Sequence, residues 1–291
     1  MLPAAQDRLE RAGFEVATHL TTSLHDARTA AGQAAGHDVV IAVGGDGTVG
    51  ACAAGIAAAE PPVRAALGII PSGGGNDTAG ALGLPVRDPL AAADLLPELP
   101  RRRIDLARAG EFVYVDIAGV GFDSEVNRLA NRTTWLPGKA RYAWAVVAQL
   151  ALCRPAHFMV ELDGLRHEAD AWFVAVANGR SYGAGIRIAP SACMDDGLLD
   201  VVVVADLSRL ELLRTFPKTF TGRHVDHPGV TIYRAAKVRI EADPTQWVFA
   251  DGEEVGQLPL VFESIPGAVD VLATPDAPAL SRPATNGEPA D

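Results

Sequence analysis

DVVIAVGGDGTVGACAAGI, residues 38–56, has the pattern of a buried strand that turns through glycines into a helix. The apolar, β-branched run from Val39 to Val43 is typical of a buried strand, and two glycines end it. Glycine lets backbone N–H groups come close to a ligand, and the start of the following helix favours an anion. The alternative is a tight turn that binds nothing, because glycine-rich turns alone occur in many proteins.

A second strand and a second glycine turn follow at once. Residues 66–70 are an apolar run, and PSGGGND, residues 71–77, leads into a short helix that ends at about Leu82. Two strand–turn–helix units in succession predict a parallel α/β sheet, in which ligands bind beyond the carboxyl ends of the strands. We therefore expect the two glycine loops to face one cleft.

A chain of 291 residues predicts two domains. Residues 1–103 are predicted to form the α/β domain, with a strand around residues 14–17 and a last strand at about 262–273 that returns to it. Residues 104–261 carry short alternating segments between turns, which predict an antiparallel β-sandwich interrupted by a helix at about 141–152. The tail, residues 274–291, is rich in proline, alanine and polar residues and is predicted to be disordered.

The composition narrows the classes of function. A formal charge of −11 argues against nucleic acid as a partner. The 3 cysteines have no CxxC spacing and indicate reduced thiols rather than disulfides or zinc ligands. The N-terminus has no long apolar region of the kind a signal peptide needs, which predicts a cytoplasmic protein.

Several separated motifs resemble one family in the same order. GGDGT (44–48), PSGGGND (71–77) and ALGLP (81–85) resemble the nucleotide-binding half of the diacylglycerol kinase catalytic-domain family, most of all its bacterial soluble lipid kinases, which are related to sphingosine kinases. The likeness continues in RRIDLA (102–107), AGVGFDSEV (118–126), ANGRSYGAG (177–185), APSACMDDGLLDVVVV (189–204) and ADGE (250–253). It implies a nucleotide-binding domain of the NAD-kinase and phosphofructokinase type, followed by a β-sandwich domain for the lipid substrate.

The resemblance implies that the two glycine loops hold ATP. The positions that carry over are Thr21, Gly44, Gly45, Asp46, Gly47, Thr48, Gly74 and Asn76. Backbone amides and hydroxyls suit phosphates, and Asp46 suits Mg²⁺ held through its water shell. Thr21 is matched by its spacing to Ala27, and a plain helix cap or loop residue is an equally good reading of it.

The ADGE segment is the candidate for the reacting end. Asp251 and Glu253 lie two residues apart, so their carboxylates can share one side of a strand or turn. A kinase needs a carboxylate to accept the proton of the hydroxyl, and the resemblance implies that Glu253 has this role. An acidic hairpin turn is the alternative, since Asp-Gly is common in such turns.

The run from Cys193 to Leu198 resembles the structural Mg²⁺ loop of the family. The ligands that carry over are the Asp196 carboxylate and the backbone carbonyls of Cys193 and Leu198, an oxygen set that suits Mg²⁺. An Asp-Gly turn before the next strand is the alternative.

The resemblance thus implies an ATP- and Mg²⁺-dependent lipid kinase that converts diacylglycerol to phosphatidic acid at the inner face of the membrane. It implies peripheral, transient membrane contact and leaves a homodimer open. The alternatives are a soluble-substrate kinase of the NAD-kinase type and a non-catalytic nucleotide- or lipid-binding module. Residues 210–218 mix apolar and basic side chains, which fits either an anionic membrane surface or, more commonly, an amphipathic helix on the core.

Three departures from the family bear on ATP affinity. The family begins with a strand and an Asn-Pro loop beside the nucleotide, whereas this sequence starts after that point. Either the start is assigned differently or that strand is absent, which would expose an edge of the sheet. Gly50 and Ala51 stand where the family has Asn-Glu, and Gly74 stands where it has threonine.

Overall fold

The computed structural model describes residues 1–61, 63–133, 144–145, 148–149 and 152–281. These residues form two compact units. Unit 1 consists of Met1–Asp105, Cys193–Asp196 and the chain from Pro266 onward, and unit 2 consists of Leu106–Ala192 and Gly197–Ile265. Two strands, β3 and β13, begin in one unit and end in the other.

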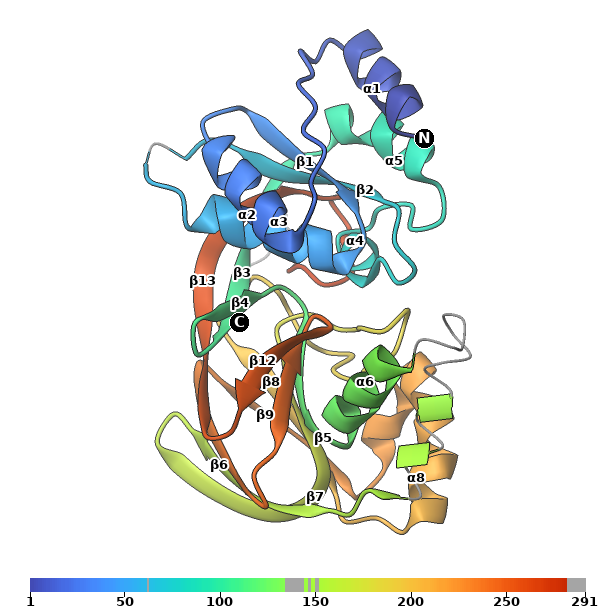
Figure 1. Ribbon diagram of the computed structural model, residues 1–291, viewed down its shortest axis with the longest axis vertical. Helices are drawn as coiled ribbons and strands as arrows, with labels where there is room; N and C mark the ends of the chain where they lie inside the picture. Colours follow the sequence, from blue (N-terminus) through green and yellow to red (C-terminus); the bar gives the residue numbers. More distant parts are fainter. Residues whose placement is uncertain (62, 134–143, 146–147, 150–151, 282–291) are drawn as a thin grey trace, which may run out of the picture. The chain divides into compact units, whose positions relative to one another are not determined.

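Unit 1 is a parallel α/β unit (Figure 1). Its elements are α1 (Leu2–Arg11), α2 (Leu24–Gln33), β1 (Val39–Gly44), α3 (Asp46–Ala57), β2 (Ala66–Pro71), α4 (Asp77–Ala81), α5 (Pro89–Leu95), η1 (Leu96–Glu98), the start of β3 (Arg101–Ala109) and the end of β13 (Leu260–Leu272). β2 lies between β1 and β13 and runs parallel to both. Every residue of β2 is buried, which explains its unbroken apolar run. The predicted parallel sheet is confirmed.

Helices cover both faces of this sheet. Ala5 and Leu9 of α1 pack with Ile70 of β2 and Leu272 of β13. α2 and α3 lie so close together that a Cβ atom on Gly55 would stand 2.1 Å from the carbonyl oxygen of Arg28. The small residues of α3 are therefore required by helix packing.

The outer edge of β1 is open. Among the described strands β1 pairs only with β2, and its other side faces a cavity of about 1000 Å³. The segment from Gly13 to Thr21 lines the same cavity. The strand predicted around residues 14–17 is not formed, because a strand needs a hydrogen-bonded neighbour and this segment has the cavity beside it.

Unit 2 is built from antiparallel strands and a few helices. Its elements are the end of β3, β4 (Phe112–Tyr114), β5 (Ile117–Gly121), α6 (Phe122–Arg132), β6 (Ala156–Leu162), β7 (Leu165–Ala177), β8 (Leu199–Ala205), α8 (Arg209–Thr215), η2 (Phe216–Thr221), η3 (Arg223–Asp226), β9 (Val230–Ala235), β10 (Lys237–Asp243), β11 (Trp247–Ala250), β12 (Glu253–Gln257) and the start of β13. β7 is the central strand, since it pairs with β6, β5 and β8.

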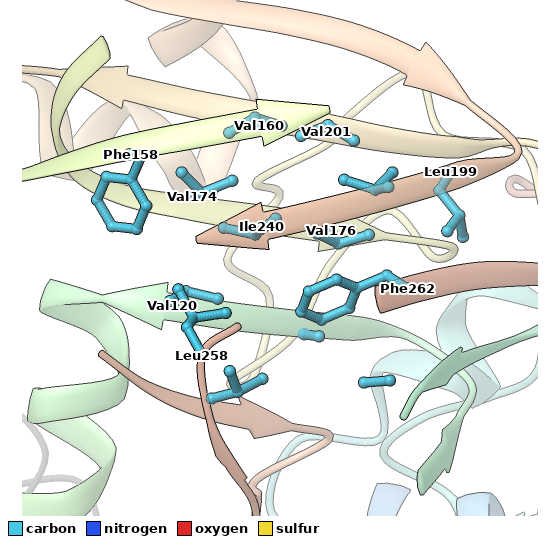
Figure 2. Packing of buried hydrophobic residues seen from close by; sticks show 14 of the residues in the cluster. Val120, Phe158, Val160, Val174, Val176, Leu199, Val201, Ile240, Leu258 and Phe262 are labelled. Atoms are coloured by element: carbon cyan, nitrogen blue, oxygen red, sulfur yellow. The ribbon is translucent and has the colours of Figure 1, made fainter. Parts of the chain in front are cut away.

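The core of unit 2 lies between its strands (Figure 2). Phe158, Val174, Val201, Ile240 and Phe262 come from five different strands and meet there. The predicted antiparallel second part is confirmed, and its strands alternate inward and outward side chains as a sandwich requires.

A second cluster lies on the other face of β5, β7 and β8. Val202 and Val204 point into it, while Val201 and Val203 point into the main core. Phe122 of α6 and Leu212 of α8 cover this face. Because both faces of β8 are buried, its valine run is continuous rather than alternating.

The structure differs from the sequence prediction in some elements and in part of the tail, and it does not describe other predicted segments. β3, β12 and α6 were not predicted, and β13 is longer than the predicted strands. Residues 274–281 are not disordered, because Ala277, Ala279 and Leu280 are buried and Ala279 donates its N–H to the carbonyl oxygen of Ala81. Residues 282–291 and most of the helix predicted at 141–152 lie outside the described residues.

Candidate active site

The first glycine loop ends β1 and starts α3, which begins at Asp46 with Gly45 as its N-cap. Asp46, Gly47 and Thr48 form the first turn of the helix, where backbone N–H groups have no partner within the helix. The Thr48 side chain lies against Gly44, because a Cβ atom on Gly44 would stand 2.6 Å from Thr48 Cβ. This loop therefore presents backbone amides rather than side chains at the carboxyl end of β1.

The second glycine loop lies against the first. A Cβ atom on Gly73 would stand 2.4 Å from Gly45 Cα, so the two backbones touch at these two glycines. Gly74 is different, since a Cβ atom there would have no atom within 4 Å. The structure therefore brings the two predicted loops together, with Gly73 as the residue that permits the contact. The sequence did not single out Gly73 from its two glycine neighbours.

Asp46 ties the two loops together. Its carboxylate accepts hydrogen bonds from the backbone N–H groups of Asn76 (2.9 Å) and Thr78 (3.2 Å). Burial raises the pKa of Asp46, the neighbouring charge of Asp77 raises it further, and the backbone N–H groups work in the opposite direction. Two acids thus lie close together in a desolvated place at the loops.

Asn76 holds the shape of the second loop. Its backbone is in the left-handed region at φ 60°, and its side chain is almost fully buried. The side-chain oxygen accepts from the N–H of Gly73 at 2.9 Å, and the amide group donates to the carbonyl oxygens of Gly73 and Val86, both at 3.1 Å. Asn76 is therefore engaged with the loop itself.

Thr21 lies in the loop before α2 and is exposed. The helix cap is Ser23, whose hydroxyl accepts from the N–H of Asp26. Thr21 and Thr48 both line the cavity beside β1. The structure thus places Thr21 at the same cavity as the first glycine loop, as a loop residue and not as the cap.

The ADGE segment forms the β11–β12 hairpin. Ala250 pairs with Glu253, so Asp251 and Gly252 make a two-residue turn with φ values of 48° and 87°. Glu253 is the first residue of β12 and is exposed. The Asp251 carboxylate points back and accepts from the N–H groups of Val115 (2.7 Å), Asp116 (3.1 Å) and Ile117 (3.1 Å). This geometry gives Asp251 the role of anchoring the turn that presents Glu253.

We expect Asp251→Asn to lower the free energy of unfolding by about 3 kcal/mol, because an amide group cannot accept from three backbone N–H groups at once. Asp163→Asn is the matched control. Asp163 also sits at φ 48° before a glycine, and its carboxylate accepts from the N–H groups of Ala236 and Lys237 at an exposed place. Urea unfolding measures the stability of both variants, and a phosphoryl-transfer assay measures activity. An equal loss of stability with full activity in both would contradict an anchoring role for Asp251.

The predicted metal loop, residues 193–198, contains the boundary between unit 1 and unit 2 in the sequence. Cys193 and Asp196 belong to unit 1, and Leu198 belongs to unit 2. Within the described residues no group of three or more His, Cys, Asp or Glu side chains could hold a metal ion. The predicted site depends on two backbone carbonyls besides Asp196 and stays a prediction.

The neighbouring acid Asp195 is the centre of a polar cluster in unit 1. Its carboxylate accepts from the backbone N–H and the hydroxyl of Ser281, both at 2.9 Å, and from the Cys193 thiol at 3.0 Å. Arg102 forms an ion pair with it at 3.3 Å. Burial works to raise the pKa of Asp195, but the hydrogen bonds and the arginine charge outweigh it and lower the pKa. Asp195 thereby ties the residues after β13 to the loop at 193–196.

An apolar pocket of about 60 Å³ lies in unit 2. Its lining includes Phe122 and Val126 of α6, Phe173 of β7, and Leu213 and Phe216 of the α8–η2 segment. None of the described helices is both long enough and apolar enough to span a membrane. Sequence reasoning did not predict this pocket, because its residues are far apart in the chain.

His224 is one of the polar residues at the wall of this pocket, beside Thr215 and Thr219. Its Nε2 lies 3.0 Å from the carbonyl oxygen of Ile188, so Nε2 carries the proton and Nδ1 is an acceptor. Burial lowers the pKa of His224, which keeps the ring neutral. Among the described residues Nδ1 has no hydrogen-bond partner. The mostly apolar pocket wall thus includes a buried acceptor, His224 Nδ1, that has no partner among the described residues.

Unit 1 has two touching glycine loops at the carboxyl ends of its parallel strands, and unit 2 has an exposed acid on a hairpin. These are the features that a phosphotransferase needs. Comparison with known proteins identifies the class more closely. Residues 1–109 match the diacylglycerol kinase catalytic domain, and residues 116–273 match the YegS C-terminal NAD kinase beta sandwich-like domain. The chain belongs to the diacylglycerol kinase catalytic-domain family, and it is a kinase.

Individual relatives agree with this assignment. The chain is 40% identical over 273 residues to a diacylglycerol kinase of Mycobacterium tuberculosis, covering 91% of this chain and 87% of that one. It is 30% identical over 261 residues to a diacylglycerol kinase of Bacillus subtilis, covering 89% and 86%. The crystal structure of a putative diacylglycerol kinase from Bacillus anthracis str. Sterne superposes with a TM-score of 0.79 at 26% identity, covering 95% of this chain and 90% of that one.

Proposed function

We propose that this protein transfers the γ-phosphoryl group of ATP to the hydroxyl group of diacylglycerol and produces phosphatidic acid and ADP at a membrane surface. The observation that carries the lipid part is the apolar pocket of unit 2, with Phe122, Phe173 and Phe216 in its wall. A pocket of about 60 Å³ can take the end of a hydrocarbon chain, whose surface is thereby removed from water. The relatives named diacylglycerol kinase support the same substrate.

The nucleotide part of the proposal rests on the two loops of unit 1. Backbone N–H groups of residues 44–48 suit the phosphates, and the contact of Gly45 with Gly73 holds both loops in place. Thr21 lines the cavity beside β1 together with Thr48, and Gly74 of the second loop is open to solvent.

Asp46, with the buried Asp77 beside it, would hold a divalent cation through its water shell, because neighbouring carboxylates in a desolvated place favour a positive charge between them. When bound, Mg²⁺ neutralises the negative charge of the phosphates. The ligand set of Asp196 with the carbonyls of Cys193 and Leu198 is proposed for a second, structural Mg²⁺.

In the proposed reaction the hydroxyl oxygen of the lipid forms a bond to the γ-phosphorus. The bond from that phosphorus to the bridging oxygen of ADP breaks, and ADP leaves with the electron pair. Glu253 accepts the hydroxyl proton and then releases it to water. Asp251 positions Glu253 through the hairpin turn that it anchors.

Transfer of label from γ-labelled ATP to lipids in mixed micelles tests the function. The panel contains diacylglycerol, a sphingoid base and phosphatidylglycerol, with NAD as the soluble acceptor. We expect label in phosphatidic acid and none in NADP. Label in NADP alone would favour a kinase of the NAD-kinase type, and ATP binding without any transfer would show a non-catalytic module.

A further inference from the structure

The α8–η2 segment has a buried side and also apolar side chains that remain exposed. Leu212, Thr215 and Thr219 are buried against unit 2. Leu210 and Phe220, in contrast, are exposed to 55% and 49%. A surface segment of a globular protein normally has a polar outer side, and exposed apolar side chains gathered in one segment are typical of an interaction surface.

Basic side chains flank the exposed apolar ones. Arg209, Arg214, Lys218 and Arg223 are all exposed in the same short segment, where Glu211 is the one acid between residues 209 and 223. The acid caps α8, since its carboxylate accepts from the N–H and hydroxyl groups of Ser208. This segment is therefore basic in a chain whose formal charge is −11.

The apolar area continues at the start of α8. Arg209 donates from Nη2 to the carbonyl oxygen of Cys153 at 3.2 Å. This contact joins the first turn of the helix to the residue that follows the exposed Leu152. Leu152, Leu210 and Phe220, together with the four basic residues, define the surface that we call the α8 face.

We propose that the α8 face docks on an anionic lipid bilayer. Leucine and phenylalanine side chains enter the boundary of the acyl chains, and the basic side chains lie at the level of anionic headgroups. A second copy of this chain fits less well, because a two-fold contact would bring Arg214 and Lys218 of both copies together. The charge of the face thus selects a bilayer as its partner.

The α8 face also reaches the apolar pocket of unit 2. Leu213 lines the pocket and is itself 48% exposed, and Phe216 lines the pocket and stacks edge-on against Phe220 with ring centroids 6.0 Å apart. α6, which forms another wall, lies on the same side of the sheet as α8 (Figure 1). Docking would place the pocket beside the bilayer, where a lipid chain enters it. That last step rests on the proposed function, whereas docking itself does not.

Sedimentation with vesicles tests the docking surface. The whole protein is mixed with vesicles of phosphatidylcholine alone or of phosphatidylcholine and phosphatidylglycerol in equal parts. We expect binding to the anionic vesicles, and at least about a ten-fold loss of binding in Arg214→Glu/Lys218→Glu, since each basic residue near an anionic surface contributes about five-fold. Leu210→Glu/Phe220→Glu should lose binding to a similar degree.

Leu165→Glu is the matched control, because Leu165 is as exposed as the others and lies on β7, away from α8. It should bind vesicles like the wild type. Wild-type protein that does not bind anionic vesicles, or double variants that bind as well as the control, would overturn the proposal. So would a dimer of the wild type in size-exclusion chromatography that the double variants convert to a monomer.

A second assay separates this proposal from the proposed function. Phosphorylation of a short-chain diacylglycerol dissolved as a monomer does not require a bilayer, and none of the four substituted residues lines the pocket. We expect Arg214→Glu/Lys218→Glu to keep wild-type activity on that substrate, and this variant alone enters the assay because Phe220 stacks against Phe216 of the pocket wall. If even the wild type fails to phosphorylate it, the proposed function fails, and the vesicle result still decides the α8 face. If Arg214→Glu/Lys218→Glu loses this activity while the wild type keeps it, the α8 face acts in catalysis and the docking proposal is wrong.

Discussion

Glu253→Gln should lower kcat for phosphoryl transfer by about 100- to 10,000-fold, the range that removal of a general base produces. Glutamine has nearly the same shape but cannot accept the hydroxyl proton. Since Glu253 is exposed at the start of β12, the variant should fold normally. Steady-state transfer from γ-labelled ATP measures kcat, and equilibrium binding measures ATP affinity, which should stay within about two-fold because only the proton acceptor is removed.

Glu254→Gln is the control for this prediction. Glu254 is the next residue of β12, is also exposed, and points to the other side of the hairpin. The same chemical change at that position should leave kcat unchanged. Equal activity in the two variants would remove Glu253 from the mechanism.

Gly73→Ala should abolish measurable ATP binding and lower the free energy of unfolding by about 1–3 kcal/mol, the usual cost of overpacking. The new Cβ atom would stand 2.4 Å from Gly45 Cα and 3.0 Å from the side-chain oxygen of Asn76. Both neighbours belong to the glycine loops, and the nearer one is backbone, so the loops must separate. Calorimetric titration with ATP and urea unfolding measure the two effects.

Gly74→Ala is the matched control in the same loop. A Cβ atom there meets no atom within 4 Å, and its φ is not in the left-handed region. The control should unfold like the wild type, and it should still bind ATP because its Cβ atom leaves the contact between the loops intact. If Gly73→Ala binds ATP as well as Gly74→Ala does, the contact between the loops has no part in nucleotide binding.

Much of the architecture follows from local patterns. The runs that became β1 and β2 are apolar and end in glycines, and parallel buried strands require that pattern. The antiparallel unit was visible because residues 156–177 and 230–250 alternate between turns. β3 was missed since it begins with three arginines yet is buried from Ile104 to Ala107, so neither period of hydrophobicity shows in it.

The residue types of the candidate site could also be predicted from the sequence, but the separate role of each residue could not. The ADGE motif pointed to Asp251 and Glu253 together, and the fold separates them, because only the Asp251 carboxylate meets backbone N–H groups of the chain around residue 116. Likewise two adjacent acids, Asp195 and Asp196, precede Gly197 in the sequence. The structure engages Asp195 with Ser281, a residue far along the chain.

The sequence by itself determined the order of the elements, the two glycine loops and the family, because these depend on neighbouring residues and on the spacing of motifs. The tertiary structure decided which glycine bears the contact between the loops and which acid is an anchor. It also decided that the α8–η2 segment keeps Leu210 and Phe220 outside while Leu212 goes inside. The physical reason is that close approach, burial and hydrogen bonding between distant segments depend on distances that no local pattern contains.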